Sequence, residues 1–516
     1  MTRFYTFLFL VLAIGLGAQE RFLDPQFGVE LQQDVVYGNN ISIITGAPAS
    51  QDLLMDVYLP EGDDNVTRPV MLVAHTGSFL PPLFNGQITG ARSDSTVTFL
   101  CTELARRGYV AVAYTYRAGW LPTSPDQNVR TGTLLQAAYR GIQDTRTCIR
   151  NMRRTVSEEN NPYGIDPDNI GVVGIGTGGY LALGAGSFFE YEEIVIDKFI
   201  DTETLLPFID TLILGNPFAD APAAICTPNH VGYNSDFNFA FNLGGALGDR
   251  EWLDGEDREP VFSGVHATND VFAPFTDGPV IVPTTNEFVV NVAGTWAAIS
   301  QANANGNNDE LTDLLYDPLS ELIDAQKERT FVSPFSAGMP IPLGADNFYA
   351  FETPFPEGSP WDWWDKATLD AVVNGTNQAL GTAFNSDTLH LNGLATNRDM
   401  SPEKGRTYMD TIMNLMLPRA CVALNLVCTG VLSAEDIVQH EVSTFPNPAS
   451  DQMTFRVGDA TIRHLQILDL NGRLVSTHNN IDVNQYTVDR GDLQTGVYIA
   501  NLIFDDGLQS IKIVFD

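Results

Sequence analysis

The first half of the chain alternates short apolar runs with longer segments that are apolar on one side only. The apolar runs lie between polar or glycine-containing turns, which is typical of buried β-strands. They occupy residues 54–59, 70–73, 109–114 and 170–174. The segments with helical periodicity occupy residues 98–107, 134–154 and 178–184. This alternation predicts an α/β fold, a doubly wound and mostly parallel sheet that helices cover on both faces.

The pattern weakens after residue 200. Apolar runs at 211–214 and 260–265 predict two further strands, and a last helix is expected at 402–417. Residues 277–399 lack a clear period and contain an unusual aromatic run that ends in Trp363-Trp364. We interpret this segment as a cap or insertion over the carboxyl edge of the sheet. Its tryptophans either fix the cap to its core or stack on a sugar or an apolar polymer.

The pattern changes again after about residue 440. Short β segments separated by turns occur at residues 453–457, 465–470, 473–476, 485–488, 497–504 and 510–515. This spacing predicts a small antiparallel all-β sandwich. We therefore expect an α/β domain over residues 19–440 and a β-sandwich over residues 441–516.

Residues 1–18 have the features of a secretory signal peptide. Arg3 precedes an apolar run at 4–16, and Ala18 supplies a small residue for cleavage. The run is too short for a membrane span, and no later stretch approaches the ~20 apolar residues that a span needs. The sequence therefore predicts an exported protein without a transmembrane segment.

The charge balance limits the partners. The chain has 28 Lys and Arg residues against 64 Asp and Glu residues, a formal net charge of −36. Such a surface repels phosphate backbones, so we expect no nucleic-acid partner. A hydrophobic share of 44% indicates a globular chain.

Five cysteines allow at most two intramolecular disulfides, and export permits them. Cys101 could pair with Cys148, and Cys421 with Cys428, which leaves Cys226 unpaired. No cysteine spacing is typical of a zinc site. The acidic loop 254–259 lacks the ligand spacing of a calcium loop, so we predict no metal site and no cofactor.

Four ordered motifs distinguish the C-terminal region. They are Phe445-Pro446-Asn447-Pro448-Ala449, the segment 469–475 (DLNGRLV), the segment 493–498 (LQTGVY) and Lys512-Ile513-Val514. In these motifs the region resembles the C-terminal sorting domain of cargo for the type IX secretion system of Bacteroidetes. The resemblance implies that the outer-membrane secretion machinery is a partner. It also implies a secreted or cell-surface protein that passes through the periplasm.

The α/β region resembles the α/β-hydrolase family of esterases and lipases over about residues 53–275. A loop at 75–79 (HTGSF) follows one strand, and a strand–turn–helix at 174–180 (GIGTGGY) follows another. The resemblance implies an oxyanion hole at the first loop, with the backbone of Gly77, Ser78 and Thr177 as donors. It also implies a nucleophile elbow in the second segment and a catalytic acid at Asp270.

The elbow lacks the expected nucleophile. Gly176 occupies the central position, where the family carries a serine, and glycine offers no side chain for acyl-enzyme chemistry. A shift of one residue makes Thr177 the nucleophile. It would then place Ile175 where a small residue is needed, and threonine is stiff at χ1.

The base has a single candidate, because a triad needs a histidine downstream of the acid. Within the domain only His390 follows Asp270. Two functions therefore remain open. The protein hydrolyses carboxylic esters with Thr177, Asp270 and His390, or with a water held by the last two. Alternatively, it is an inactive relative that binds a small ester, a glycan or a polymer fragment in the cleft.

Overall fold

The computed structural model describes residues 20–282, 287–312, 314, 317–426, 428, 440, 442–458, 460–468, 474–478, 481–491, 493–504 and 507–516. The expected signal peptide and the motif residues 469–473 lie outside them. Residues Phe22–Cys428 form one compact unit, and the described residues from 440 onward form another. Each unit is described by itself.

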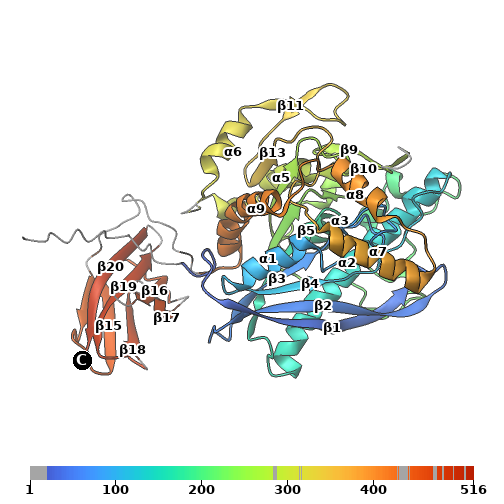
Figure 1. The fold of residues 1–516 in the computed structure, drawn as a ribbon. Coiled ribbons are helices and arrows are strands. Elements are labelled where there is room, and N and C mark those ends of the chain that lie inside the picture. The colour runs from blue at the N-terminus through green and yellow to red at the C-terminus, as the bar shows by residue number, and fades with distance from the viewer. Residues whose placement is uncertain are drawn as a thin grey trace, which may run out of the picture. The chain divides into compact units, whose positions relative to one another are not determined.

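An eight-stranded sheet forms the centre of the first unit (Figure 1). Its order is β1-β2-β4-β3-β5-β6-β8-β13. The β1/β2 and β2/β4 pairs are antiparallel, and every pair from β4/β3 to β8/β13 is parallel. The strands are β1 (Gly28–Ser42), β2 (Ala49–Glu61), β3 (Arg68–Ala74), β4 (Val110–Tyr114), β5 (Ile165–Ile175), β6 (Phe239–Leu243), β8 (Val261–Ala267) and β13 (Phe348–Phe351).

Helices cover both faces of this sheet, as the alternating pattern predicts. In β3, Leu72 packs into one hydrophobic core and its neighbours Met71 and Val73 into another, because successive side chains point to opposite faces. The first core includes α2 (Gln127–Glu158), α3 (Thr177–Ser187) and α5 (Thr295–Asn305), and the second includes α1 (Ser95–Ala105), α6 (Ser320–Lys327) and α9 (Pro402–Ala423). The predicted α/β fold class is confirmed.

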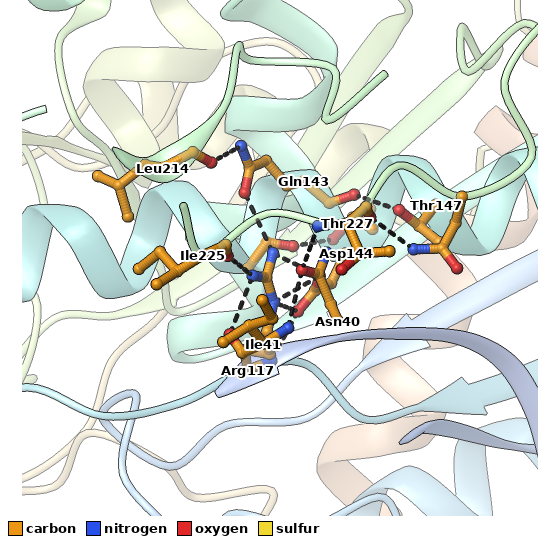
Figure 2. A network of polar contacts seen from close by, with 12 residues as sticks. Asn40, Ile41, Arg117, Gln143, Asp144, Thr147, Leu214, Ile225 and Thr227 are labelled. Atoms are coloured by element: carbon orange, nitrogen blue, oxygen red, sulfur yellow. Dashed lines mark hydrogen bonds and ion pairs between the residues drawn. The ribbon is translucent and has the colours of Figure 1, made fainter. Parts of the chain in front are cut away.

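A buried ion pair anchors the loop that follows β4 (Figure 2). The guanidinium of Arg117 lies 2.9 Å from Asp144 on α2, and both side chains are fully buried. Arg117 also donates to Gln143 Oε1 (3.1 Å) and to the carbonyl of Ile225 (3.2 Å). These contacts fix the course of residues 116–120, which approach the candidate site.

The prediction of a strand at 211–214 is wrong. Thr211–Leu214 is a single helical turn, α4, because the Asp210 side chain accepts a hydrogen bond from the Leu212 N–H and Gly215 ends the turn. Leu212 is 82% exposed, unlike a residue of a central strand. The strand beside β5 is β6, whose buried polar Asn242 interrupts its apolar run.

The segment 277–399 is not entirely a cap. It contributes β13, which pairs with β8 at the end of the main sheet, and α5, which packs against that sheet. Two helices, α7 (Lys366–Leu380) and α8 (Ser386–Ala395), form a separate small hydrophobic cluster with Leu83. The remaining strands are β7 (Ala246–Leu247), β9 (Asp277–Ile281) and β10 (Phe288–Gly294) in one small sheet, and β11 (Thr330–Val332) and β12 (Pro340–Pro342) in another.

The second unit is the predicted all-β domain. Its seven described strands form two antiparallel sheets, β14-β15-β18 and β17-β16-β19-β20, which share one hydrophobic core. The strands are β14 (Val442–Phe445), β15 (Gln452–Val457), β16 (His464–Leu468), β17 (Leu474–His478), β18 (Gln485–Asp489), β19 (Gly496–Phe504) and β20 (Gly507–Phe515).

Of the two possible disulfides, Cys421–Cys428 is present. Cys101 and Cys148 are buried and free. They do not pair because they lie in the two different hydrophobic cores, on opposite faces of the sheet. Among the described residues, no helix combines the length and apolarity needed to cross a membrane.

Candidate functional site

The turn between β5 and α3 has the backbone of an elbow without its side chain. Gly176 links strand to helix with φ 53° and ψ −115°, a conformation that favours glycine. The helix starts so close to the sheet that a Cβ at Gly178 would overlap the carbonyl of Ala74. The glycines of the 174–178 segment therefore have steric roles, and the sharp strand-to-helix turn expected from the sequence is present.

Thr76 occupies the space that a side chain at position 176 would need. A Cβ at Gly176 would overlap Thr76 Oγ1 and lie 3.0 Å from Thr76 Cβ. Since threonine is branched at Cβ and stiff at χ1, it does not yield easily. Gly176 and Thr76 therefore fit each other, because a glycine at position 176 leaves room for the Thr76 side chain.

The loop after β3 carries Gly77 and Ser78, which the sequence predicts as oxyanion-hole donors. Gly77, Ser78 and Phe79 all have positive φ. Trp120 Nε1 donates to the carbonyl of Ser78 (2.7 Å), and the Gly119 N–H donates to that of Phe79 (2.7 Å). In the described part of the chain, the N–H groups of Gly77 and Ser78 donate no hydrogen bond.

Thr177 begins α3 beside this loop, and its hydroxyl contacts another hydroxyl rather than a base. Thr177 Oγ1 lies 3.3 Å from the phenol oxygen of Tyr116, which also donates to the carbonyl of His75 (2.9 Å). Burial raises the pKa of Tyr116 well above its usual value. A neutral phenol cannot take a proton from Thr177, so this contact does not activate a nucleophile.

Asp270 follows β8 and is 4% exposed. Its Oδ1 accepts hydrogen bonds from the N–H groups of Phe272 (2.7 Å) and Ala273 (3.4 Å), and its Oδ2 lies 3.5 Å from His266 Nε2. Burial raises the pKa of Asp270 to about 7 and lowers that of His266 to about 4. The imidazole beside the expected acid is therefore neutral His266, which precedes Asp270 in the chain.

His390 lies elsewhere, on α8. Its Nδ1 accepts a hydrogen bond from Trp364 Nε1 (3.0 Å), and the two rings meet edge to face. His390 is not among the residues that line the cavity beside Gly176. The structure brings Thr177 and Asp270 to this cavity and leaves His390 outside its lining.

The cavity has a volume of about 170 Å³ and a largely apolar lining. Gly77, Ser78, Gly176, Thr177 and Asp270 all line it. Its described lining contains no lysine, arginine or histidine.

Asp362 is a site residue that the sequence reasoning missed. It lines the cavity at 8% exposure, and its Oδ1 accepts a hydrogen bond from the Thr96 hydroxyl (2.8 Å). Burial raises the pKa of Asp362 to about 6, and nearby Asp94 has its own pKa raised to about 7. The available signal was an aspartate inside an apolar aromatic run, since a carboxylate is seldom placed there without a role.

The aromatic run itself explains how Asp362 is held. Trp361 is buried in the core that includes α1, and Trp363 meets Phe99 of that helix edge to face. Trp364 lines the cavity instead. Two of the three tryptophans therefore fix the segment to its core, and the third is available to a ligand. Among the described residues, no group of three or more His, Cys, Asp or Glu side chains is placed to hold a metal ion.

Several solved esterases are similar to this chain. Esterase 2 of Thermogutta terrifontis, phosphorylated by paraoxon, is 19% identical over 48% of this chain and 74% of its own, with a TM-score of 0.28. The same enzyme with bound propionate is 19% identical over 48% of this chain and 75% of its own, with a TM-score of 0.27. Esterase B of Lactobacillus rhamnosis, inhibited by a tributyrin phosphonate, is 17% identical over 49% of this chain and 70% of its own, with a TM-score of 0.25.

No curated protein matches the chain by sequence. Residues 443–516 match the family of secretion system C-terminal sorting domains. This match confirms the resemblance found in the C-terminal motifs. The chain is an α/β protein with a C-terminal sorting domain, which directs it through type IX secretion to the cell surface or the extracellular space.

Proposed function

We propose that the first unit binds a small, largely apolar ligand in the cavity beside Gly176 and does not form a serine-type acyl-enzyme. The observation that carries this proposal is the fit of Gly176 to Thr76. The nucleophile is absent, and the space for its side chain is filled by a neighbouring hydroxyl.

The lining of the cavity supports a binding role. Six aromatic side chains line it: Phe79, Trp120, Tyr180, Phe199, Phe272 and Trp364. Ligand sites are typically concave, apolar and supplied with a few placed polar groups. Here those groups are the free N–H groups of Gly77 and Ser78 and the carboxyl groups of Asp270 and Asp362.

Ester hydrolysis is the second candidate, because Thr177, Asp270 and the oxyanion-type loop share one cavity. It requires a base for Thr177 or for a water molecule. His390 would have to leave Trp364 to supply it, and His266 is fully buried behind Asp270. This candidate therefore depends on a rearrangement of the cap.

Two measurements on the full chain test the proposal. The first is turnover of p-nitrophenyl acetate and butyrate by the wild type, Thr177→Val and Asp270→Asn. We expect the same background rate from all three. Turnover that either substitution abolishes would overturn the proposal in favour of hydrolysis.

The second measurement is calorimetric titration with 2-phenylethanol, a neutral apolar probe. Ala138 lines the cavity from α2, so Ala138→Trp should fill it and weaken binding at least tenfold. Ala367→Trp, at an exposed position of α7, is the control for added aromatic surface. Absence of binding to the wild type, or equal binding to Ala138→Trp, would contradict a ligand site here.

A further inference from the structure

Two buried carboxyl groups line the cavity, and neither has a cationic partner among the residues that the structure describes. Among the described residues, the polar partners of the Asp270 carboxylate are two backbone N–H groups and the neutral ring of His266. Asp362 accepts one hydrogen bond, from Thr96, and its second oxygen accepts none within the described residues. Buried carboxylates are normally paired with a cation, because desolvation of an unpaired charge costs several kcal/mol.

Two other buried carboxylates of this chain follow that rule. Asp144 pairs with Arg117 at 2.9 Å, and Asp56 pairs with Arg92 at 2.8 Å. The cavity differs, since no lysine, arginine or histidine occurs in its described lining. The unpaired carboxyl groups therefore form a local feature in the part of the molecule that is open to a ligand.

The rest of the lining suits an organic cation. Tyr180, Trp120 and Trp364 line the cavity, and aromatic rings attract an ammonium group through their faces. The start of α3 attracts anions, because a helix N-terminus carries about half a positive elementary charge. The negative charge of two ionised carboxylates exceeds that positive charge.

We propose that this cavity selects a small organic cation, an ammonium group on an apolar or aromatic body, with Asp362 and Asp270 as its counter-charges. This inference rests on the proposed binding function and adds the chemical class of the ligand. The ammonium replaces the missing cationic partner of the carboxyl groups, and the apolar body packs on the aromatic lining. Burial favours the neutral form of the carboxyl groups, and the charge of a bound cation offsets this effect by favouring the ionised form.

The test compares three probes of similar shape on the full chain at pH 8 and 150 mM salt. They are 2-phenylethylammonium, 2-phenylethanol and 3-phenylpropionate, each titrated by calorimetry. We expect the ammonium to bind at least tenfold more tightly than the alcohol, and the carboxylate to bind most weakly. An ammonium that binds no better than the alcohol, or a carboxylate that binds best, would overturn the proposal.

Variants separate the site from the general negative charge of the chain. Asp362→Asn keeps an oxygen for Thr96 and should lower the preference for ammonium over alcohol at least threefold, with alcohol binding within twofold of wild type. Asp387→Asn removes an exposed carboxylate on α8 and should leave the preference unchanged. Equal losses in both variants would assign the preference to net charge and refute the site.

The same data distinguish this inference from the proposed function. Binding of the alcohol that Ala138→Trp blocks supports a ligand site whatever the charge preference. Ammonium binding that Ala138→Trp does not block would place the cation elsewhere and overturn the inference. The charge preference is therefore decided separately from the presence of a site.

Discussion

The elbow part and the carboxyl part of the cavity are built in different ways. The elbow part, Gly176 and Thr177 with the loop 76–78, consists of the ends of two adjacent parallel strands and the start of a helix. The carboxyl part, Asp270 and Asp362, comes from segments far apart in the chain. The first is a sharp strand-to-helix turn with glycine at its centre, whereas the second holds two buried titratable groups.

This difference teaches that the backbone geometry of a turn is by itself weak evidence for chemistry. The elbow geometry follows from strand order and steric limits at Gly178, which hold with or without catalysis. The carboxyl groups cost stability where they are buried, so their presence is the stronger indication of a function.

The largest expected effect concerns the support of the elbow part. Asp144→Ala leaves Arg117 buried without its partner and should lower the free energy of unfolding by about 3–5 kcal/mol. Urea denaturation of the full chain measures this. Asp387→Ala, at an exposed ion pair, should cost less than about 1 kcal/mol. Similar losses from both would show that the network of Figure 2 does not support the site.

A smaller effect is expected at the elbow itself. Gly176→Ser introduces a Cβ at positive φ against Thr76 and should lower the free energy of unfolding by about 2–3 kcal/mol. Thr76→Ala removes the overlapping hydroxyl, so the double variant should recover about 1 kcal/mol of that loss. Additive losses in this double-mutant cycle would mean that the two residues are not fitted to each other.

The carboxyl part should respond to pH. Burial raises the pKa of Asp362 to about 6 from about 4 in the unfolded chain, so wild-type stability from this group falls as pH rises from 4 to 6. Asp362→Asn lacks this loss and should gain roughly 2 kcal/mol relative to wild type between pH 4 and pH 7. Thr96 and Asp94 are the groups that face Asp362. A stability difference that stays constant over this range would contradict the raised pKa.

The smallest effect is expected at His390. His390→Gln should cost about 1 kcal/mol of stability through its bond to Trp364 and should leave 2-phenylethanol binding within twofold of wild type. Calorimetry and urea denaturation measure the two quantities. If the wild type turns over p-nitrophenyl esters and His390→Gln abolishes it, His390 reaches the cavity and the comparison above fails.

Much of the fold was predictable because its signals are local. The runs at 70–73 and 170–174 are apolar and buried on both faces, which identifies central parallel strands. The prediction of a strand at 211–214 was wrong because a short apolar run does not distinguish a strand from a helical turn. The Asp210 side chain, which caps the turn, decides between them. Strand β6 was missed because its Asn242 interrupts the apolar pattern, although a hydrogen bond to the Thr295 hydroxyl satisfies it.

The candidate site was predictable to the same extent. Its elbow part and Asp270 were located through motifs that sit at strand ends. Asp362 was not. Its place inside an apolar aromatic run is a signal, but no motif assigns such an aspartate to the elbow, and only the packing of the chain brings it to the cavity. Chain order suggested His390 as the partner of Asp270. Chain order says nothing about distance in the folded chain, where His390 bonds Trp364.

By itself, the sequence determined the α/β class, the sharp turn at Gly176, the absence of a serine there and the sorting domain at the C-terminus. These depend on residues close together in the chain, where periodicity and steric limits act directly. Only the tertiary structure decided that Thr76 fills the empty position, that His390 bonds Trp364 instead of Asp270, and that Asp362 joins Asp270 at the cavity. Each of these depends on contacts between segments distant in sequence, whose approach is set by the packing of the whole unit.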